Sequence, residues 1–344
     1  MTDSKKLHSV HFLRFVAAVA VVFHHTISVF GTHFALGAAG VDIFFVISGL
    51  VIGLSLLSGD SPRDFAAKRL IRVLPAYWLA TIAFMWFEYF SNGGVFAWTE
   101  ILRSFALWPV FGTGWHPIYF AGWSLTYELL FYMVAVTSLA CFRRSAWFAC
   151  LLVMGVFAAT RFPVPFGAPN SHFASQMCLE FCFGLAVAYA VRQKVALSKH
   201  YGLSLILFSV FVFACNPTDA SDPRQIFWGV PAAALILGLL SFDDAKFFRH
   251  PFAKLGGDAS YAVYLTHLTV LNALYYIAFR MGINRTEHPW VVPVFALPSA
   301  IAIGILAHLA IEKPVLKSLR WAFIRRSAQA PLSEPVVDDR VSGA

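Results

Sequence analysis

The chain has 344 residues, of which 59% are hydrophobic and only 13% are charged, and its formal net charge is +8. This composition excludes an ordinary water-soluble domain, and the repeated apolar runs of spanning length predict an integral membrane protein. The positive charge does not indicate a nucleic-acid partner, because the Lys and Arg residues lie in short segments between apolar runs and not on one basic face.

The first apolar segment, residues 8–30, carries two ionisable side chains, Arg14 and His25. On a helix, their spacing places both side chains on one face, about 16 Å apart along the axis. Ionisable groups in a membrane helix are costly, so the pair predicts a functional site that faces the interior of a helical bundle. The alternative is an arginine that reaches the membrane interface and a histidine that hydrogen-bonds a neighbouring helix.

Two carboxyl groups enter the membrane from the opposite side. Asp42 lies near the start of the second predicted span, at a depth where it could hydrogen-bond His25 and orient that imidazole as a general base. An acidic group that stabilises a helix N-terminus is an equal alternative for Asp42. Glu128 lies about two turns inside the fourth predicted span. It is a candidate second acid–base group or ligand for a sugar hydroxyl, and its alternative role is a hydrogen bond between helices.

A basic segment precedes the third predicted span. Arg69 and Arg72 are three residues apart, so they project from one helix face near the expected inner end of Arg14. Three guanidinium groups that converge there can bind phosphate oxygens through paired hydrogen bonds. Anionic lipid headgroups are the alternative ligand of the same patch.

The ninth predicted span begins beside Ser260 and Tyr261 and carries His267 about 10 Å deeper. Ser260 and Tyr261 are candidate binding residues near the inner face, whereas His267 either lines the same cavity or is a core histidine. The segment 312–314, with charges followed by a proline, predicts the end of the last span. Motifs for a nucleophile elbow, a phosphate loop, a dinucleotide fingerprint or a zinc site are absent from the sequence, so no metal is predicted.

The predicted fold is therefore an all-α, polytopic bundle of about ten transmembrane helices, with both termini in the cytoplasm. In that orientation 20 of the 26 Lys and Arg residues lie inside, five lie outside, and Arg14 lies within the first span. Residues 1–326 form the predicted membrane domain, and residues 327–344 form a predicted disordered tail. The predicted spans are 8–30, 39–58, 73–90, 122–141, 145–161, 173–191, 201–216, 226–241, 259–280 and 291–311.

Five motifs, in this order, resemble acyltransferase family 3 of bacterial multi-pass membrane proteins. They extend from about residue 7 to residue 314, and together they make the resemblance strong. They are Arg14 with ten residues before His25, the run Gly40-Val41-Asp42-Ile43-Phe44-Phe45-Val46-Ile47-Ser48-Gly49, the run Arg69-Leu70-Ile71-Arg72-Val73-Leu74-Pro75-Ala76-Tyr77, the run Trp123-Ser124-Leu125-Thr126-Tyr127-Glu128, and the segment from Ser260-Tyr261 to His267.

The resemblance implies a bacterial inner-membrane O-acyltransferase that uses cytoplasmic acyl-CoA, with acetyl-CoA expected, and modifies an extracytoplasmic saccharide such as an exopolysaccharide or its lipid-linked precursor. It implies that Arg14 and His25 are the important pair and that Arg69 and Arg72 handle acyl-CoA. Expected partners are the saccharide acceptor, the lipid bilayer and polysaccharide assembly proteins. The expected reaction is direct transfer with His25 as base, and a covalent acyl-histidine is the less favoured variant.

Two other classes of function remain open from the residues. The first is a glycolipid or polysaccharide transporter or flippase, against which stand the lack of an internal repeat and the separation of arginines from carboxylates. The second is a non-catalytic membrane scaffold, for which so many buried ionisable groups would be an unnecessary cost.

Overall fold

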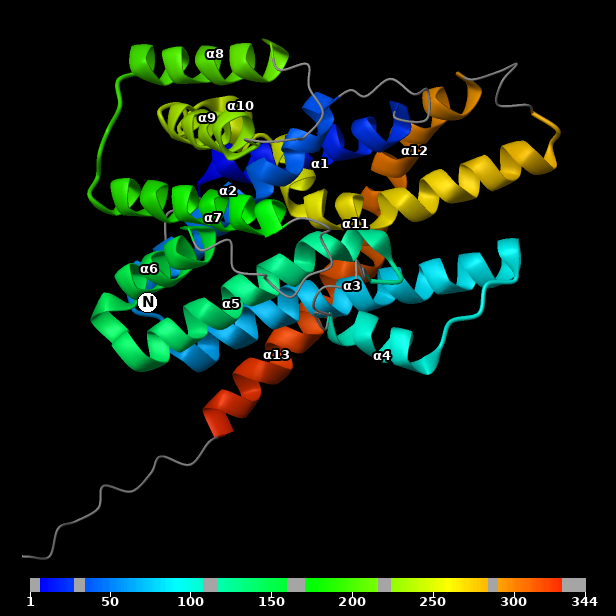
Figure 1. Ribbon diagram of the computed structural model, residues 1–344, viewed down its shortest axis with the longest axis horizontal. Helices are drawn as coiled ribbons and strands as arrows, with labels where there is room; N and C mark the ends of the chain where they lie inside the picture. Colours follow the sequence, from blue (N-terminus) through cyan, green and yellow to red (C-terminus); the bar gives the residue numbers. More distant parts are fainter. Residues whose placement is uncertain are drawn as a thin grey trace, which may run out of the picture.

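The computed structural model describes residues 7–27, 35–107, 117–159, 171–215, 224–283 and 290–329, and within these ranges all regular structure is helical (Figure 1). This confirms the predicted all-α class. The elements are α1 (His8–Ile27), α2 (Ala35–Ser58), α3 (Pro62–Asn92), α4 (Trp98–Ala106), η2 (Phe120–Gly122), α5 (Trp123–Phe142), η3 (Arg143–Ser145), α6 (Ala146–Ala159), α7 (Ser171–Arg192), α8 (Lys199–Cys215), η4 (Gln225–Gly229), α9 (Val230–Leu240), α10 (Lys246–Arg249), α11 (Pro251–Arg280), α12 (Val291–Ala307), η5 (His308–Glu312) and α13 (Lys313–Gln329).

Helices overlap every one of the ten predicted spans. Six helical segments of the described chain are long and apolar enough to cross a membrane, and one of them, residues 120–159, contains both α5 and α6. Two further apolar segments, α8 and η4 with α9, are shorter than that length. The structure therefore supports a multi-pass membrane protein, and the exact number of ten spans stays a prediction.

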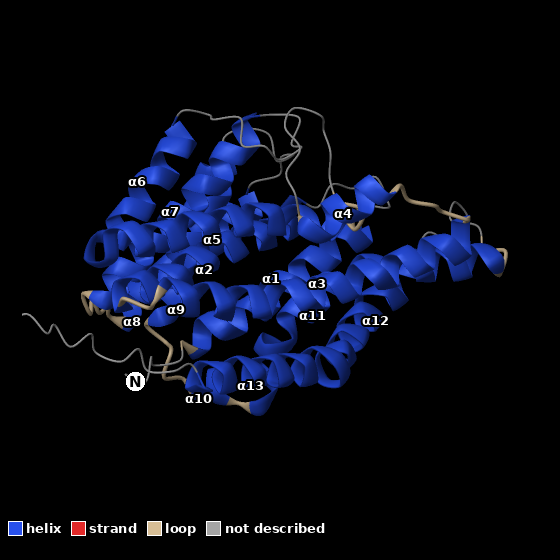
Figure 2. Ribbon diagram, turned by 90° about the horizontal axis from the view of Figure 1, so that it is seen from below, coloured by secondary structure: helices blue, strands red, loops and turns tan. Residues whose placement is uncertain are grey.

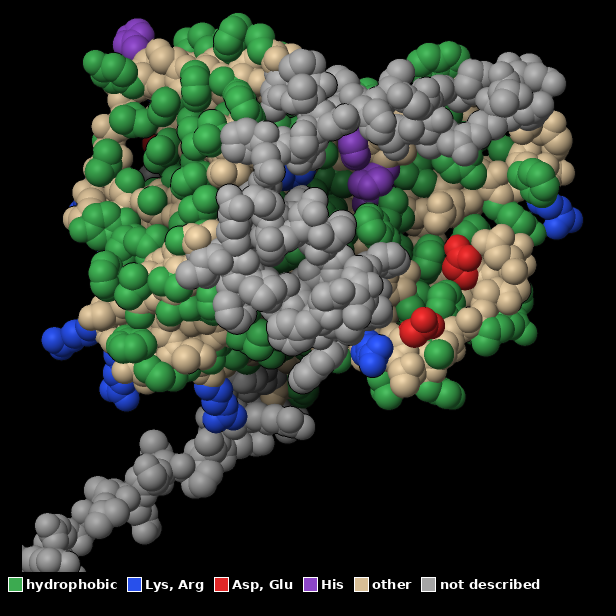
Figure 3. Space-filling model, viewed as in Figure 1, with side chains coloured by type: hydrophobic (Ala, Val, Ile, Leu, Met, Phe, Trp, Pro, Cys, Tyr) green, Lys and Arg blue, Asp and Glu red, His purple; other side chains and the backbone are tan. Residues whose placement is uncertain are grey.

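The outer surface of the bundle has the composition expected for contact with lipid. Large apolar side chains such as Trp86 and Phe90 are more than half exposed, at 61% and 67%. Figure 3 shows many hydrophobic side chains on the described part of one face of the molecule. In water such a large apolar surface would be unfavourable, whereas hydrocarbon chains can cover it without cost.

The third helix begins eleven residues earlier than the predicted span, at Pro62. Ser61 caps it, because its side chain accepts a hydrogen bond from the backbone N–H of Asp64 at 3.1 Å, and Pro62 occupies the first turn, where its missing N–H is no loss. Hydropathy could not find this start, because the first turns are charged. The early start puts Arg69 and Arg72 on a rigid helix and not on a loop.

The predicted helix end at residues 312–314 is wrong. The chain instead continues from α12 through the π-helical turn η5 directly into α13, which ends at Gln329. A π turn shifts the backbone hydrogen-bond register, and Pro314 then stands in the first turn of the next helix, where proline is tolerated. Residues 327–329 of the predicted disordered tail are therefore helical, and residues 330–344 lie outside the described chain.

Between the third and fourth predicted spans lies the short helix α4. Trp98 and Leu102 are 79% and 67% exposed on it, whereas Ser104 is buried. The backbone oxygen of Ser104 accepts a hydrogen bond from the hydroxyl of Tyr77 at 3.0 Å, which fastens α4 to α3. This arrangement fits a helix that lies at the membrane interface. Figure 2 shows α4 towards the upper side of the bundle, while α10 and α13 lie along the lower side.

The centre of the bundle is α2, which packs against α1 on one side and α7 on the other. The contact with α7 depends on two glycines that face each other, Gly49 and Gly184. A Cβ atom built on Gly184 would lie only 2.2 Å from the backbone oxygen of Val46. Small residues allow membrane helices to approach this closely, and van der Waals packing then holds them together.

We expect Gly184→Ala to destabilise the folded protein by about 1–3 kcal/mol, because the added methyl group would force α2 and α7 apart. The measurement is the thermal unfolding midpoint of the purified protein in detergent. Gly155→Ala is the matched control, since a Cβ atom there meets nothing within 4 Å. Equal midpoints for the two variants would show that the close contact between α2 and α7 is not needed for stability.

Candidate active site

A cavity opens inside the bundle between α1, α2, α3, α5 and α11. The empty space within it and at its mouth, including open solvent, measures about 770 Å³. Its walls combine apolar side chains with an unusual number of polar ones for a membrane interior. The polar lining residues are Arg14, Ser48, Arg69, Arg72, Ser124, Glu128, Tyr132, Tyr261 and Tyr264.

The three predicted arginines, Arg14, Arg69 and Arg72, do line one cavity. Arg14 comes from α1, and the other two come from the early turns of α3. The buried Nε atoms of Arg14 and Arg69 have no hydrogen-bond partner within the described chain. Arg69 does donate through Nη2 to the hydroxyl of Ser55 at 3.2 Å, and its guanidinium lies 5.4 Å from the ring centre of Phe65. Cationic donors left unpaired in a cavity predict an anionic ligand.

Glu128 lines this same cavity, so the predicted separation of the arginines from the carboxylates is wrong for this residue. Its carboxylate accepts hydrogen bonds from the hydroxyl of Tyr132 and, at 3.3 Å, from the hydroxyl of Ser48. One carboxylate among three guanidiniums offsets part of their mutual repulsion and leaves the cavity net positive.

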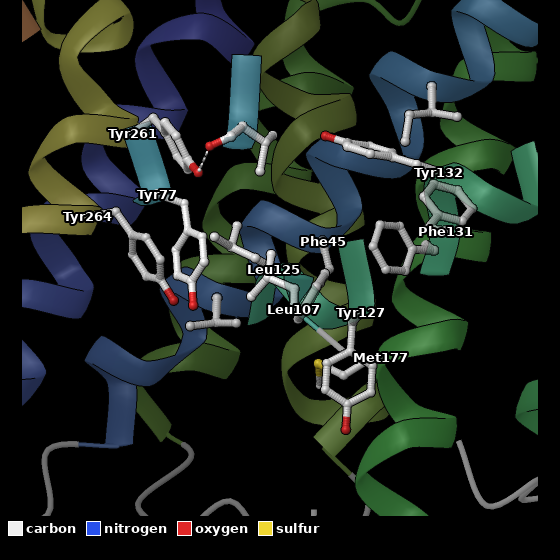
Figure 4. Close-up of a cluster of buried hydrophobic side chains, with 14 of the residues drawn as sticks. Phe45, Tyr77, Leu107, Leu125, Tyr127, Phe131, Tyr132, Met177, Tyr261 and Tyr264 are labelled. Carbon is white, nitrogen blue, oxygen red and sulfur yellow. Dashed lines mark hydrogen bonds between the residues drawn. The ribbon is translucent and has the colours of Figure 1, made fainter. Parts of the chain in front are cut away.

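Tyrosines form much of the polar wall, and Figure 4 shows Tyr261 and Tyr264 on one side of Leu125 and Tyr132 on the other. Tyr261 donates to the backbone oxygen of Val73 at 2.9 Å, which ties α11 to α3. Tyr264 donates to the backbone oxygen of Ala121 at 3.1 Å. These bonds hold the walls in place without help from a ligand.

The other predicted binding residue of this segment, Ser260, does not line the cavity. It is fully buried, and its hydroxyl donates to the backbone oxygen of Gly257 within its own helix at 2.9 Å. Tyr261, its neighbour in the chain, is a lining residue. Adjacent residues of a helix point about 100° apart, so Tyr261 can face the cavity while Ser260 points away from it.

His25 lies in the C-terminal half of α1 and is not among the residues that line the cavity. Its Nδ1 lies 3.0 Å from the backbone oxygen of Val21, and a carbonyl oxygen can only accept. This bond puts the proton of a neutral imidazole on Nδ1 and the lone pair on Nε2. The ring centre of His267 lies 5.0 Å from that of His25, and the ring centre of Tyr264 lies 5.7 Å from that of His267. A row of aromatic side chains thus connects His25 with the cavity wall.

Asp42 does not orient His25, contrary to the prediction. Its carboxylate accepts two hydrogen bonds from Arg224, at 2.7 Å from Nε and 2.6 Å from Nη2. Both side chains are almost fully buried, and Trp228 lies against the guanidinium with its ring centre 4.6 Å away. Arg224 stands beside the eighth predicted span, and nothing in that segment indicates that the fold brings it to α2. This buried ion pair joins α2 to the start of η4.

We expect Asp42→Asn to lower the amount and the unfolding midpoint of the folded protein, because it removes the carboxylate that accepts both hydrogen bonds from the buried Arg224. Breaking one side of such a pair costs about 3–5 kcal/mol. The measurement is folded yield and thermal unfolding in detergent, with activity expressed per folded molecule. A catalytic role would predict the opposite pattern, with normal folding and lost activity per molecule.

Several functional candidates were not predicted from the sequence. Tyr132 and Tyr264 line the cavity, but a tyrosine in a membrane span is too common to stand out in a single sequence. Glu180 on α7 is fully buried close to the ion pair of Asp42 and Arg224. An intramembrane carboxyl group is a detectable signal, and the rule that singles out Glu128 applies equally to Glu180.

Comparison with known proteins supports a single family. A family model described as an acyltransferase domain matches residues 7–309. The exopolysaccharide production protein ExoZ of Rhizobium meliloti is 30% identical over 302 residues, which cover 83% of this chain and 92% of the relative. Nodulation protein 10 of Rhizobium leguminosarum is 26% identical and covers 84% of each chain. The acyltransferase MdmB of Streptomyces mycarofaciens is 25% identical over 88% of this chain and 86% of the relative. No solved structure matches the chain significantly.

Proposed function

Because this chain belongs to the acyltransferase family whose model spans residues 7–309, we propose that it moves an acyl group from acyl-CoA to a saccharide hydroxyl outside the cytoplasm. The chain is a transferase of acyl groups other than aminoacyl groups. The observation that carries the proposal is the cavity with three arginines, of which Arg14 and Arg69 have buried Nε donors without partners in the described chain. Coenzyme A has a diphosphate and a 3′-phosphate, which are the anions that clustered guanidiniums bind best.

The proposed membrane topology of the protein follows from the distribution of its Lys and Arg residues. Ten spans with both termini in the cytoplasm put most Lys and Arg residues inside, as the positive-inside rule requires. Arg69 and Arg72 then lie near the inner surface, where cytoplasmic acyl-CoA arrives, and His25 lies in the outer half of α1. The bacterial inner membrane is the proposed location, because it separates a cytoplasmic donor from an extracytoplasmic acceptor.

The proposed reaction uses the distance along α1 between Arg14 and His25. The phosphates bind Arg14, Arg69 and Arg72, and the pantetheine arm extends about 16 Å to present the thioester near His25. His25 Nε2 then removes the proton from the acceptor hydroxyl, whose oxygen attacks the thioester carbon. The carbon–sulfur bond breaks, and the thiolate leaves as the thiol after it takes a proton. Glu128 is proposed to position Arg14 and the donor, because its carboxylate lies with the arginines.

A saccharide acceptor is proposed because the relative in Rhizobium meliloti is an exopolysaccharide production protein. Acetyl is the proposed acyl group on family grounds alone. The competing proposal, a glycolipid transporter or flippase, would use the same polar cavity as a substrate path. The family match favours the transferase.

The test is acyl transfer by sealed inside-out membrane vesicles that contain the protein, with radiolabelled acetyl-CoA outside and the host exopolysaccharide or its lipid-linked precursor present. We expect label in the saccharide fraction, released by mild alkali as an ester would be. Vesicles without the protein are the control. Translocation of a lipid-linked saccharide without any label would instead support the transporter.

A further inference from the structure

Two hydroxyl groups, those of Ser124 and Tyr264, meet on the wall of the cavity, and we call them the hydroxyl pair. Ser124 belongs to α5 and Tyr264 belongs to α11, and both residues line the cavity. Their oxygen atoms are 2.8 Å apart, which is the distance of a hydrogen bond. Both residues are almost fully buried. The proposed reaction does not use this hydroxyl pair.

Both hydrogen atoms of the hydroxyl pair are used inside the protein. Tyr264 donates to the backbone oxygen of Ala121 at 3.1 Å, and Ser124 donates to Tyr264. If the bond between the two hydroxyl groups is reversed, Ser124 donates to Ala121 at 3.5 Å instead. Among the bonds of the described chain, each arrangement uses both hydrogen atoms and leaves a lone pair on the oxygen of Ser124. The hydroxyl pair therefore offers a hydrogen-bond acceptor to a ligand, and its partner must be a donor.

The directions of the helices show where the hydroxyl pair lies along the cavity, beginning with α1 and α2. A Cβ atom on Gly37 of α2 would lie 2.5 Å from the Cβ atom of His24 on α1. A Cβ atom on Gly40, further along α2, would lie 2.4 Å from the backbone oxygen of Ala17, which is further back along α1. The two helices are therefore antiparallel, and the start of α2 lies at the level of the C-terminal half of α1, which carries His25.

The next helix, α5, runs in the same direction as α2. The ring centre of Phe45 on α2 lies 6.5 Å from that of Trp123 on α5. Ser48, nearly one turn later on α2, donates to Glu128, which is more than one turn later on α5. Ser124 is four residues before Glu128, so it lies about 6 Å from that residue along the axis, towards the level of the C-terminal half of α1.

Tyr264 lies on the same route from the other side of the cavity. Its ring centre is 5.7 Å from that of His267, and the ring centre of His267 is 5.0 Å from that of His25. Phe44, which also lines the cavity, has its ring centre 5.8 Å from that of Tyr264. A donor whose phosphates bind the arginines and whose thioester reaches His25 therefore passes the hydroxyl pair with the middle of its pantetheine arm.

We propose that the hydroxyl pair binds the pantetheine arm of acyl-CoA, and that the oxygen of Ser124 accepts a hydrogen bond from an amide N–H of that arm. Pantetheine contains two amide groups, and an amide N–H that leaves water for a largely apolar wall needs an acceptor there. Tyr264 is a positioning residue, because its bond to Ser124 holds that oxygen in place. This inference rests on the proposed function, because it takes acyl-CoA as the donor.

The test combines a change in the full-length enzyme with a change in the donor. Ser124→Ala removes the acceptor, and two analogues of acetyl-CoA each replace one amide of the arm by an ester, which removes its N–H. We expect Ser124→Ala to lower kcat/KM for acetyl-CoA by about 5–50-fold. One of the two analogues should be worse than acetyl-CoA by a similar factor on the wild-type enzyme. That analogue should lose almost nothing further with Ser124→Ala, because the same hydrogen bond is already absent.

Thr126→Val is the matched control, because Thr126 lies on the same helix, does not line the cavity and donates its hydroxyl to the backbone oxygen of Trp123. We expect this control to keep kcat/KM unchanged.

Three results would overturn the inference while an active wild type keeps the proposed function. The first is an equal rate of the wild-type enzyme with acetyl-CoA and both ester analogues, a measurement that needs no folded variant. The second is a loss from Ser124→Ala that is as large with each analogue as with acetyl-CoA. The third is a rise in KM for the saccharide alone, which would assign the bond to an acceptor hydroxyl. Absence of acyl transfer by the wild type would overturn the proposed function itself.

Discussion

Replacing His25 with glutamine is expected to lower kcat by about 10²–10⁴-fold, the contribution typical of a positioned general base. Glutamine has a similar length but cannot take up a proton at neutral pH. The Nδ1 bond of His25 stays within α1, so we expect the amount of folded protein to change little. KM for acyl-CoA should also change little, because His25 does not line the cavity with the arginines.

The matched control for this variant is His24→Gln. His24 precedes His25 on α1, and its ring centre lies 5.2 Å from that of His25. We expect near-normal kcat for this control, measured with the same labelled donor and acceptor. A His25→Gln enzyme that folds normally and keeps its full rate would show that another group removes the proton.

Replacing Arg14 with glutamine is expected to raise KM for acyl-CoA by about 10–100-fold, because one or more charge-assisted hydrogen bonds to phosphate are lost. Arg14→Lys keeps the charge but loses the planar pair of donors, so it should give a smaller rise. The measurement is the initial rate of label transfer as a function of acyl-CoA concentration.

Arg63→Gln provides the control for Arg14, because Arg63 is exposed on the first turn of α3 and does not line the cavity. It removes the same charge from the protein and should leave KM unchanged. An Arg14→Gln enzyme with normal KM, but with a rate that depends on the anionic lipid content of the vesicles, would assign the arginines to lipid headgroups instead.

The local chemistry of the site was predictable because each signal is local in sequence. Arg14 and His25 can be identified as functional candidates from the sequence, because an ionisable residue in a long apolar segment is costly and is seldom kept there without a function. Arg69 and Arg72 share a helix face by their spacing alone, and the structure places both on the cavity with Arg14. The helical class and the approximate positions of the helices follow from hydropathy in the same way.

The partners of the carboxylates were not predictable, because they depend on contacts between distant segments. The expected depth of Asp42 in the membrane predicts a hydrogen bond with His25. The fold instead pairs Asp42 with Arg224, which is 182 residues away in the sequence. Depth likewise assigns Glu128 to the outer groups, whereas the packing of α5 against α2 and α3 brings it to the arginines. Depth in the membrane limits which residues can meet but does not say which helices are neighbours.

The sequence by itself thus determined that this is a helical membrane protein with two ionisable residues, Arg14 and His25, on one face of its first helix, since burial in lipid makes each such residue costly. Only the tertiary structure decided which groups share the cavity, which pair holds α2 to η4, and that His267 stands beside His25. These contacts depend on how the helices pack, through close approaches such as that of Gly49 and Gly184. Helix packing is the sum of many small van der Waals contacts between segments, so it cannot be predicted from any one segment of the sequence.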